Sequence, residues 1–408
     1  MDWQSVTKYY PGDQLFPNLR GLAVSNDLGS ASLPLFIRPP LRHLSLHWFD
    51  LNGLAPLIEA LPKSFTSLET LRIYTVDAYK ADKLISGGIV SRAITKLQAL
   101  TVLHVEVLLP ETLEHLASLP TLCELQFVVQ VVGPATSPLR FSALKRLDVK
   151  TWTDNPSPLL SFLRRLSAPA LQGLKIIFEA YNPAVAMTHG NWDSRHLRPT
   201  AAYVHAVLAA VFRLPHIHSF TFEGPMLAPS SSPDPQHTLD ITTLSPLLAL
   251  HDLETLVMHH VPIRFVPADI ESMARAWPKM KSLRLSDADP RIAYAVQYVG
   301  VEDLLPFVRH CPGLCTLGLP VRIPETFAPA VVLLAGKPRS AVQELFVLDI
   351  DKKFSPDAVA FLADVFPCAV LAQSFGDAGT LQAVNDMKEF LLKKIHQEDS
   401  NSNSLQDA

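Results

Sequence analysis

The sequence predicts an α/β solenoid, in which each repeat supplies one short strand to a curved parallel sheet inside and one helix to an outer layer. Two observations predict this fold. An apolar pattern, Leu-x-x-Leu-x-Leu with other large apolar residues as substitutes, recurs twelve times along the chain. Segments with helical periodicity lie between many of the copies, so that strand and helix alternate.

The strands are predicted from the pattern itself. Its last two apolar residues stand two apart, so they share one face of a short strand, while the first, called here the leading residue, packs where the strand begins. A single strand and helix cannot bury their apolar faces alone, so neighbouring units must stack. The copies are LRGLAV at 19–24, LRHLSL at 41–46, LETLRI at 68–73, LTVLHV at 100–105, LCELQF at 122–127, LKRLDV at 144–149, LQGLKI at 171–176, IHSFTF at 217–222, LETLVM at 253–258, MKSLRL at 280–285, LCTLGL at 314–319 and VQELFV at 342–347.

The helices are predicted from the stretches between the copies. Ser157-Pro158 and Ser355-Pro356 each read as an N-cap followed by proline at the first helical position. Examples of segments with helical periodicity are Leu54–Leu61, Ser157–Leu166, Ala201–Leu214, Pro267–Trp277, Glu302–His310, Glu325–Leu334 and Pro356–Phe366.

Proline marks the switch from helix to strand. The chain of 408 residues has 34 Pro but only 16 Gly. Proline ends a helix and biases the preceding residue toward extended backbone. Glycine is scarce because few of these turns need a positive φ. Seven copies carry proline two residues before the leading residue: Pro17, Pro39, Pro120, Pro169, Pro215, Pro278 and Pro312.

Composition excludes several classes of protein. Hydrophobic residues make up 48% of the chain and charged residues 18%, which is too apolar for a disordered chain. The net charge of −4 argues against a general binder of nucleic acid or of anionic membranes. The four cysteines are too few for a disulfide framework, and neither a signal peptide nor an apolar stretch long enough to span a bilayer is seen. We therefore expect an intracellular protein, cytoplasmic or nuclear.

The predicted organisation has four parts. Residues 1–14 form an N-terminal segment and residues 15–370 form the solenoid. Two loops interrupt the repeat spacing near 180–200 and 223–243, and the second contains the turn-rich run PSSSPDPQ. Residues 371–397 are predicted to hold an amphipathic helix that caps the last repeat, and residues 398–408 form a disordered tail.

These repeats resemble leucine-rich repeats of the irregular, helix-rich kind found in F-box proteins. The stretches LFPNLRGLAVSN at 15–26 and SLPLFIRPPLRHLSLHWF at 32–49 are most similar to the repeat region of fungal, basidiomycete-like F-box proteins. The resemblance covers roughly residues 15–370 and implies a solenoid that binds a protein target for ubiquitination. The F-box itself is not found, since only 18 residues precede the first copy.

No motif of catalysis, cofactor binding or metal binding is recognised. A glycine-rich phosphate loop and a Gly-x-Ser-x-Gly elbow are both missing. Cys311 and Cys315 have ligand-like spacing, but their places in the repeat favour structural thiols over a zinc site. His216/His218 and His259/His260 lie at strand ends, where neighbouring side chains point to opposite faces, so we expect structural or surface roles.

The candidate binding surface is the concave face of the sheet. Residues flanking or between the apolar pair of each strand point away from the core onto this face. Side chains of both signs together with a tyrosine suit a protein ligand better than a polyanion, although each residue taken alone is better explained as a solvated strand position. The candidates are Arg72, Tyr74, His104, Glu106, Gln126, Asp148, Lys150, Lys175, Glu223, His259 and Arg284.

Three functions follow from these observations. The first is a non-enzymatic protein-recognition solenoid, by resemblance the target-binding part of an F-box ubiquitin-ligase receptor. Its partners would be a protein target and, only if an F-box is missing from this chain, a Skp-type adaptor and a cullin. The second is a stand-alone leucine-rich-repeat scaffold or inhibitor with no link to a ligase. The third is a hydrolase-type enzyme on an irregular α/β fold, which no motif supports.

Overall fold

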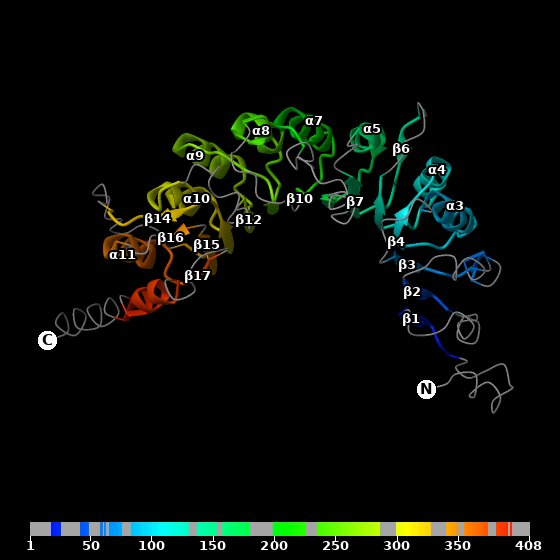
Figure 1. Cartoon of the computed structure of the whole chain (residues 1–408), viewed down its shortest axis with the longest axis horizontal. Coiled ribbons are helices and arrows are strands. Elements are labelled where there is room, and N and C mark those ends of the chain that lie inside the picture. The colour runs from blue at the N-terminus through cyan, green and yellow to red at the C-terminus, as the bar shows by residue number, and fades with distance from the viewer. Residues whose placement is uncertain are drawn as a thin grey trace, which may run out of the picture. The chain divides into compact units, whose positions relative to one another are not determined.

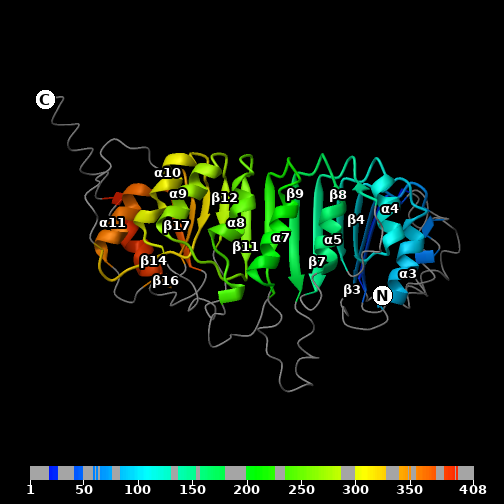
Figure 2. The ribbon, with the colours of Figure 1, turned by 90° about the horizontal axis from the view of Figure 1, so that it is seen from above.

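The structure is a computed structural model, and it describes residues 18–25, 41–48, 58–59, 61–62, 65–75, 83–129, 137–152, 157–179, 199–225, 235–285, 299–327, 340–347, 349–350, 355–373, 381–390 and 392–393. The chain divides into two compact units, Met1–Asn191 and Trp192–Ala408. In each unit parallel strands lie side by side, and helices cover one face of the sheet (Figures 1 and 2). This is the repeat architecture of a leucine-rich-repeat solenoid, as the sequence predicts.

The first unit carries seven parallel strands among its described residues, in the spatial order in which they occur along the chain. A short side sheet joins β6 (Leu139–Arg140) to β8 (Leu166–Ser167). The main strands are β1 (Gly21–Ser25), β2 (His43–Trp48), β3 (Thr70–Thr75), β4 (Val102–Val107), β5 (Glu124–Val128), β7 (Arg146–Trp152) and β9 (Gly173–Glu179), and the helices are α3 (Lys83–Ile94), α4 (Pro110–Ser118) and α5 (Ser157–Arg165).

The second unit repeats the arrangement with six parallel strands in chain order. Its side sheet pairs β14 (Arg322–Ile323) with β16 (Asp349–Ile350). The main strands are β10 (Ser219–Glu223), β11 (Thr255–His259), β12 (Ser282–Arg284), β13 (Thr316–Gly318), β15 (Glu344–Val347) and β17 (Val370–Gln373). The helical elements are α7 (Ala201–Val211), η4 (Pro235–His237), α8 (Ile241–Leu248), α9 (Pro267–Ala276), η6 (Glu302–Leu304), α10 (Leu305–His310) and α11 (Pro356–Val365).

The apolar pattern forms the core between sheet and helices. In β7, for example, Leu147 and Val149 are fully buried, while the residues between and around them are partly or fully exposed. Burial of one such side chain contributes about 1.5–3 kcal/mol, so the repeated pattern supplies the main stabilisation of each unit. All twelve predicted strands are present in the structure.

Proline occupies a β-turn between helix and strand. The N–H of the leading residue Met280 donates to the carbonyl of Trp277 over 3.1 Å, and Leu314 donates to Cys311 in the same way. Pro278 therefore takes the second position of the turn, where its fixed φ is favoured. The residue before it, Trp277, is fully buried with non-helical backbone (φ −121°, ψ 64°), so it anchors the turn in the core.

A thirteenth strand, β17, lies outside the predicted set. Its leading residue Ala369 stands only two residues before Leu371, where the pattern requires three. Pro367 nevertheless precedes Ala369 by two residues, as the proline rule demands. The sheet thus continues to Gln373, and the predicted boundary of the solenoid at residue 370 is too early.

Within each unit, a single carbonyl joins a strand to its predecessor, except at β17. The carbonyl of Arg42 accepts N–H groups from both Glu69 (2.8 Å) and Thr70 (2.9 Å). In the second unit the carbonyl of Glu254 accepts from Lys281 (2.7 Å) and Ser282 (3.0 Å). Both lone pairs of one oxygen are therefore used at the start of the next strand.

Several predicted segments need correction. Helices α3, α4 and α8 lie between copies of the pattern but outside the helical segments named from the sequence, and residues 325–327 of the expected helix 325–334 are not helical. The predicted loop 223–243 begins inside β10, contains η4 and ends inside α8. The segments 180–198 and 226–234 of the two loops, like residues 1–14 and the tail, lie outside the described residues, as does most of the expected helix 54–61.

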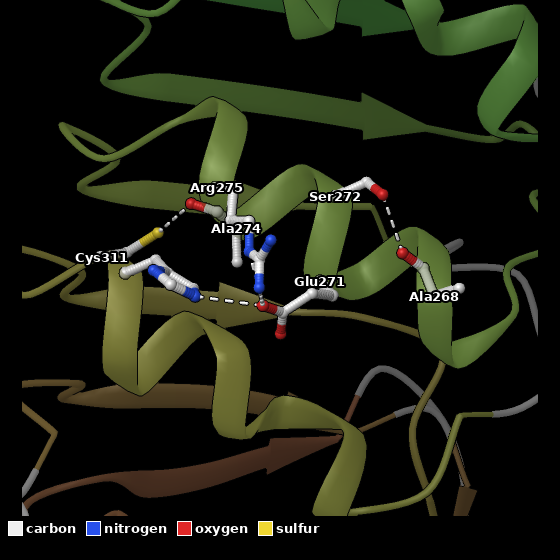
Figure 3. Close-up of polar contacts among 7 residues, drawn as sticks. Ala268, Glu271, Ser272, Ala274, Arg275 and Cys311 are labelled. Atoms are coloured by element: carbon white, nitrogen blue, oxygen red, sulfur yellow. Dashed lines mark hydrogen bonds and ion pairs between the residues drawn. The ribbon is translucent and has the colours of Figure 1, made fainter.

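The helix layer of the second unit is joined by polar contacts between neighbouring repeats. Glu271 of α9 accepts from Arg275 on the same helix (2.7 Å) and from His310 of α10 (3.2 Å). Cys311 Sγ donates to the carbonyl of Ala274, and the whole group lies on the facing sides of α9 and α10 (Figure 3).

A C-terminal helix covers the edge of β17. Residues 381–390 and 392–393 are helical. The Asn385 side chain accepts the N–H of Leu371 and donates to the carbonyl of the same residue, both over 3.1 Å. Lys388 is buried and donates to the carbonyls of Pro367 and Ala369. The Asn385 side-chain amide thus pairs with the edge of β17 as a further strand would.

Within the described ranges, every helix is too short or too polar to span a lipid bilayer.

Candidate functional site

The sheet face opposite the helices, called here the open face, carries the predicted binding residues. In β3 the side chains of Leu71 and Ile73 are buried toward the helices, while Arg72 and Tyr74 are half-buried on the other face. In β3, strand alternation therefore places Arg72 and Tyr74 on the open face. Eight lie in the first unit (Arg72, Tyr74, His104, Glu106, Gln126, Asp148, Lys150 and Lys175) and three in the second (Glu223, His259 and Arg284).

Four side chains of the first unit form a connected cluster on this face. The Tyr74 hydroxyl lies 2.9 Å from His104 Nδ1, and His104 Nε2 lies 2.6 Å from Glu124 Oε1. His47 stacks on the Tyr74 ring with centroids 4.6 Å apart. We call His47, Tyr74, His104 and Glu124 the tyrosine cluster.

Strand pairing positions this cluster. His47 is paired with Tyr74 across β2 and β3. His104, in β4, is the pairing partner of Arg72. His104 is only 8% exposed, and both of its ring nitrogens have partners within the protein. Tyr74 is therefore held on one side by the stack on His47 and on the other by the hydrogen bond to His104. The sequence analysis did not select His47 or Glu124. Their positions at the end and start of strands were the only available signal.

The rest of the open face of the first unit carries charges of both signs. Lys150 Nζ lies 2.7 Å from Glu179 Oε1, and both side chains are about 30% exposed. Asp148 is paired in register with Lys175 on one side and Gln126 on the other. Acidic and basic side chains are therefore mixed on this face, which gives no broad patch of positive charge for a polyanion.

The open face of the second unit has a different polar group. The Arg284 guanidinium lies 4.3 Å from the centroid of the Phe346 ring, and its Nη2 lies 3.1 Å from Glu344 Oε2. His259 neighbours His260, whose φ of 59° is the positive-φ exception among described residues other than glycine. The structure thus brings three of the eleven predicted residues into polar clusters, Tyr74 and His104 in the first unit and Arg284 in the second.

The tyrosine cluster resembles a catalytic relay only in the order of its groups. A hydroxyl, an imidazole and a carboxylate follow one another, as in acyl-transfer sites. Such a site also needs N–H groups that converge on a developing oxyanion. Strands β3, β4 and β5 are each paired on both sides, and the pairing of β3 with β4 up to Arg72 and His104 engages amides there in the sheet. The geometry favours holding a tyrosine ring in place over attack on a substrate.

Metal and thiol chemistry receive no support from the described part of the chain. There, no three His, Cys, Asp or Glu side chains gather in a group that would hold a metal ion. Cys311 is buried, and its Sγ donates to the carbonyls of Ala274 and Trp277. Burial raises the pKa of this thiol to about 12, so the thiolate needed for zinc ligation is disfavoured. Cys315 is exposed.

Comparison with known proteins gives a likeness of fold. No protein-family model matches the chain, and no curated protein matches its sequence. Among solved structures, the crystal structure of an internalin (inlF) from Listeria monocytogenes str. 4b F2365 is similar at 13% sequence identity and a TM-score of 0.45. The match covers 92% of this chain and 94% of the internalin chain.

Proposed function

We propose that the chain is a protein-recognition solenoid whose open face binds a protein target, with the tyrosine cluster at the centre of the contact in the first unit. Tyr74 is the observation that carries this proposal. Its ring is partly exposed on the open face and is held by the stack on His47 and the hydrogen bond to His104. Tyrosine is enriched among residues that dominate binding energy, and a ring already held in place loses little entropy on binding.

The proposal is tested by comparing two aromatic substitutions in the full chain. Tyr74→Ala removes a ring from the open face, while Phe212→Ala removes a 48% exposed ring at the end of α7 in the helix layer. Affinity purification with quantitative mass spectrometry should find a protein that the wild type and Phe212→Ala capture and Tyr74→Ala loses, with an affinity drop of about 30-fold. Equal capture by both variants would contradict the proposal.

On the resemblance of residues 15–49 to fungal F-box repeat regions, we further propose that the bound target is presented for ubiquitination. A Skp-type adaptor and a cullin join such a complex through an F-box, for which the residues of this chain show no pattern. The protein should therefore be purified as its natural gene expresses it. Co-purification of adaptor and cullin supports the ligase role. Capture of a target without them favours the stand-alone scaffold or inhibitor.

A further inference from the structure

Two arginines occupy the same position in their repeats and differ in what they contact. Arg72 in β3 and Arg284 in β12 each stand between the last two apolar residues of the pattern, so both lie on the open face. Arg284 has an aromatic ring and a carboxylate, as described above. Arg72 has neither a hydrogen bond nor an ion pair with any residue that the structure describes, and its buried Nε lacks an acceptor. The Nε of Arg284 also lacks one, but its Nη2 is bonded to Glu344.

The path by which Arg284 reaches its partners crosses one strand. Its pairing partner in β13 is Gly318, which is paired in turn with Phe346 in β15. Because glycine has no side chain, the arginine can extend over β13 to the Phe346 ring and to Glu344 at the start of β15. Neighbouring strands are about 4.8 Å apart, so two strand spacings lie within reach of an arginine side chain.

The first unit contains the same acid but a different residue in the path. Glu124 starts β5, two strands beyond Arg72, as Glu344 starts β15, two strands beyond Arg284. His104 stands where the second unit has Gly318. The His104 imidazole occupies the space over β4, and its Nε2 lies 2.6 Å from Glu124 Oε1. His104 therefore intercepts the carboxylate that would otherwise pair with Arg72.

The result is a cation on a half-buried surface with no anion bonded to it among the described residues. Desolvation of a guanidinium is costly unless an acceptor compensates for it, and a bidentate carboxylate is its best-matched partner. Lys150 in the same unit has Glu179, so the missing partner is a feature of Arg72 and not of the whole face. The Tyr74 ring lies two residues along the same strand from Arg72, on the same face. An arginine and a tyrosine side by side are the residue types that dominate binding sites.

We propose that Arg72 binds a carboxylate of an acidic side chain on the protein target, in place of the Glu124 carboxylate that His104 has taken. This assignment rests on the proposed function of the open face. A singly charged carboxylate is favoured over a phosphate because Glu124 and Glu106 lie on the two next strands, where their charges oppose a dianion more strongly.

The test uses random dodecapeptides displayed on phage and selected on the immobilised full chain. Peptides selected by the wild type should share an Asp or Glu, and replacing that residue by its amide should weaken binding about tenfold or more. Arg72→Gln should cause the same loss. His104→Gly, which copies Gly318 and frees Glu124 for Arg72, should also weaken binding although Arg72 is retained. Arg92→Gln, an exposed arginine on α3 in the helix layer of the same unit, should leave binding unchanged.

The outcomes separate this assignment from the proposed function. Peptides that lose affinity with Tyr74→Ala but not with Arg72→Gln use the open face without the carboxylate, and the assignment is then wrong. A set of selected peptides indifferent to both substitutions overturns both proposals. Circular dichroism confirms that each variant is folded, and Arg72→Gln remains decisive if His104→Gly does not fold, because a partly exposed side chain is changed without altering the backbone.

Discussion

Substitution of Asn385 should loosen the end of the sheet. Its side chain makes two hydrogen bonds to Leu371, one to each backbone polar group of that residue in β17. At about 1 kcal/mol of net stabilisation per bond, Asn385→Ala should lower the free energy of local opening there by about 2 kcal/mol. Where exchange follows the opening equilibrium, the Leu371 amide should exchange with solvent roughly 30-fold faster.

Hydrogen exchange read by mass spectrometry on peptides that cover 369–373 measures this change. Gln382→Ala is the matched control, because Gln382 lies on the same helix and is exposed, with its amide bonded to Asp386. That variant should leave exchange in β17 as it is in the wild type. Unchanged exchange in Asn385→Ala would refute the view that this amide replaces a neighbouring strand.

Asn385→Asp separates the two bonds. The new carboxylate keeps an acceptor for the Leu371 N–H but places a second acceptor against the Leu371 carbonyl. Ionisation is therefore disfavoured in the folded state, which raises the pKa of the introduced group above its unfolded value. Its protonated form can donate to the carbonyl, so the deficit relative to wild type should shrink as pH falls toward about 4. A deficit independent of pH would contradict this account.

Three further predictions concern single residues. Gly224→Ala should destabilise the second unit by about 2 kcal/mol in urea unfolding, because a Cβ there would lie 2.6 Å from the carbonyl oxygen of His260; wild-type stability would contradict this. Burial raises the pKa of the Cys311 thiol to about 12, so Cys311 should resist iodoacetamide in the folded chain and react once the chain is unfolded. Mass spectrometry of labelled peptides measures this, and labelling at the rate of the exposed thiols would contradict the burial of Cys311. Burial raises the pKa of Glu271, but hydrogen bonds from His310 and from Arg275 on its own helix lower this pKa below 4.5 overall. The ionised carboxylate therefore stabilises the fold above pH 4.5, and this stabilisation is lost as pH falls through the folded pKa. His310→Gln should flatten the acid side of the pH–stability curve, measured by urea midpoints from neutral pH to about pH 3.

The strands could be predicted because the pattern that specifies them is local. Two apolar residues two apart and a leading residue three earlier fit within six positions, and proline marks the turn before them. β17 was missed because Ala369 is small and one position closer to Leu371 than the pattern allows. The proline rule alone, applied to Pro367, would have found it.

Helix α8 shows why some helices could not be predicted. Pro246 lies inside it, and an internal proline normally argues against a helix, because it leaves the carbonyl four residues earlier without a donor. Here the Ser245 hydroxyl donates to that carbonyl, of Thr242, over 2.7 Å. At the N-terminus Asp240 accepts the N–H of Thr243 over 2.8 Å. The compensation depends on side-chain geometry that periodicity does not record.

The side chains that lie on the open face could be predicted, but the contacts among them could not. Alternation along a strand places Arg72 and Tyr74 on the open face from sequence alone. That His104 meets Glu124, and thereby leaves Arg72 without it, depends on the register of three strands separated by intervals of unequal length. Such register depends on how whole repeats stack, and the sequence of a single repeat does not determine it.

The shared carbonyl at the start of a strand has a consequence for the length of the repeats. Register between neighbours is set at one oxygen atom, as at Arg42 and Glu254, whatever the length of chain that lies between the strands. Intervals between copies that range from 22 to 36 residues are therefore compatible with one unbroken pairing scheme within each unit. Sequence inserted after a strand, ahead of the next turn, should lengthen the polypeptide without shifting the ladder, so these intervals are natural places for engineered insertions.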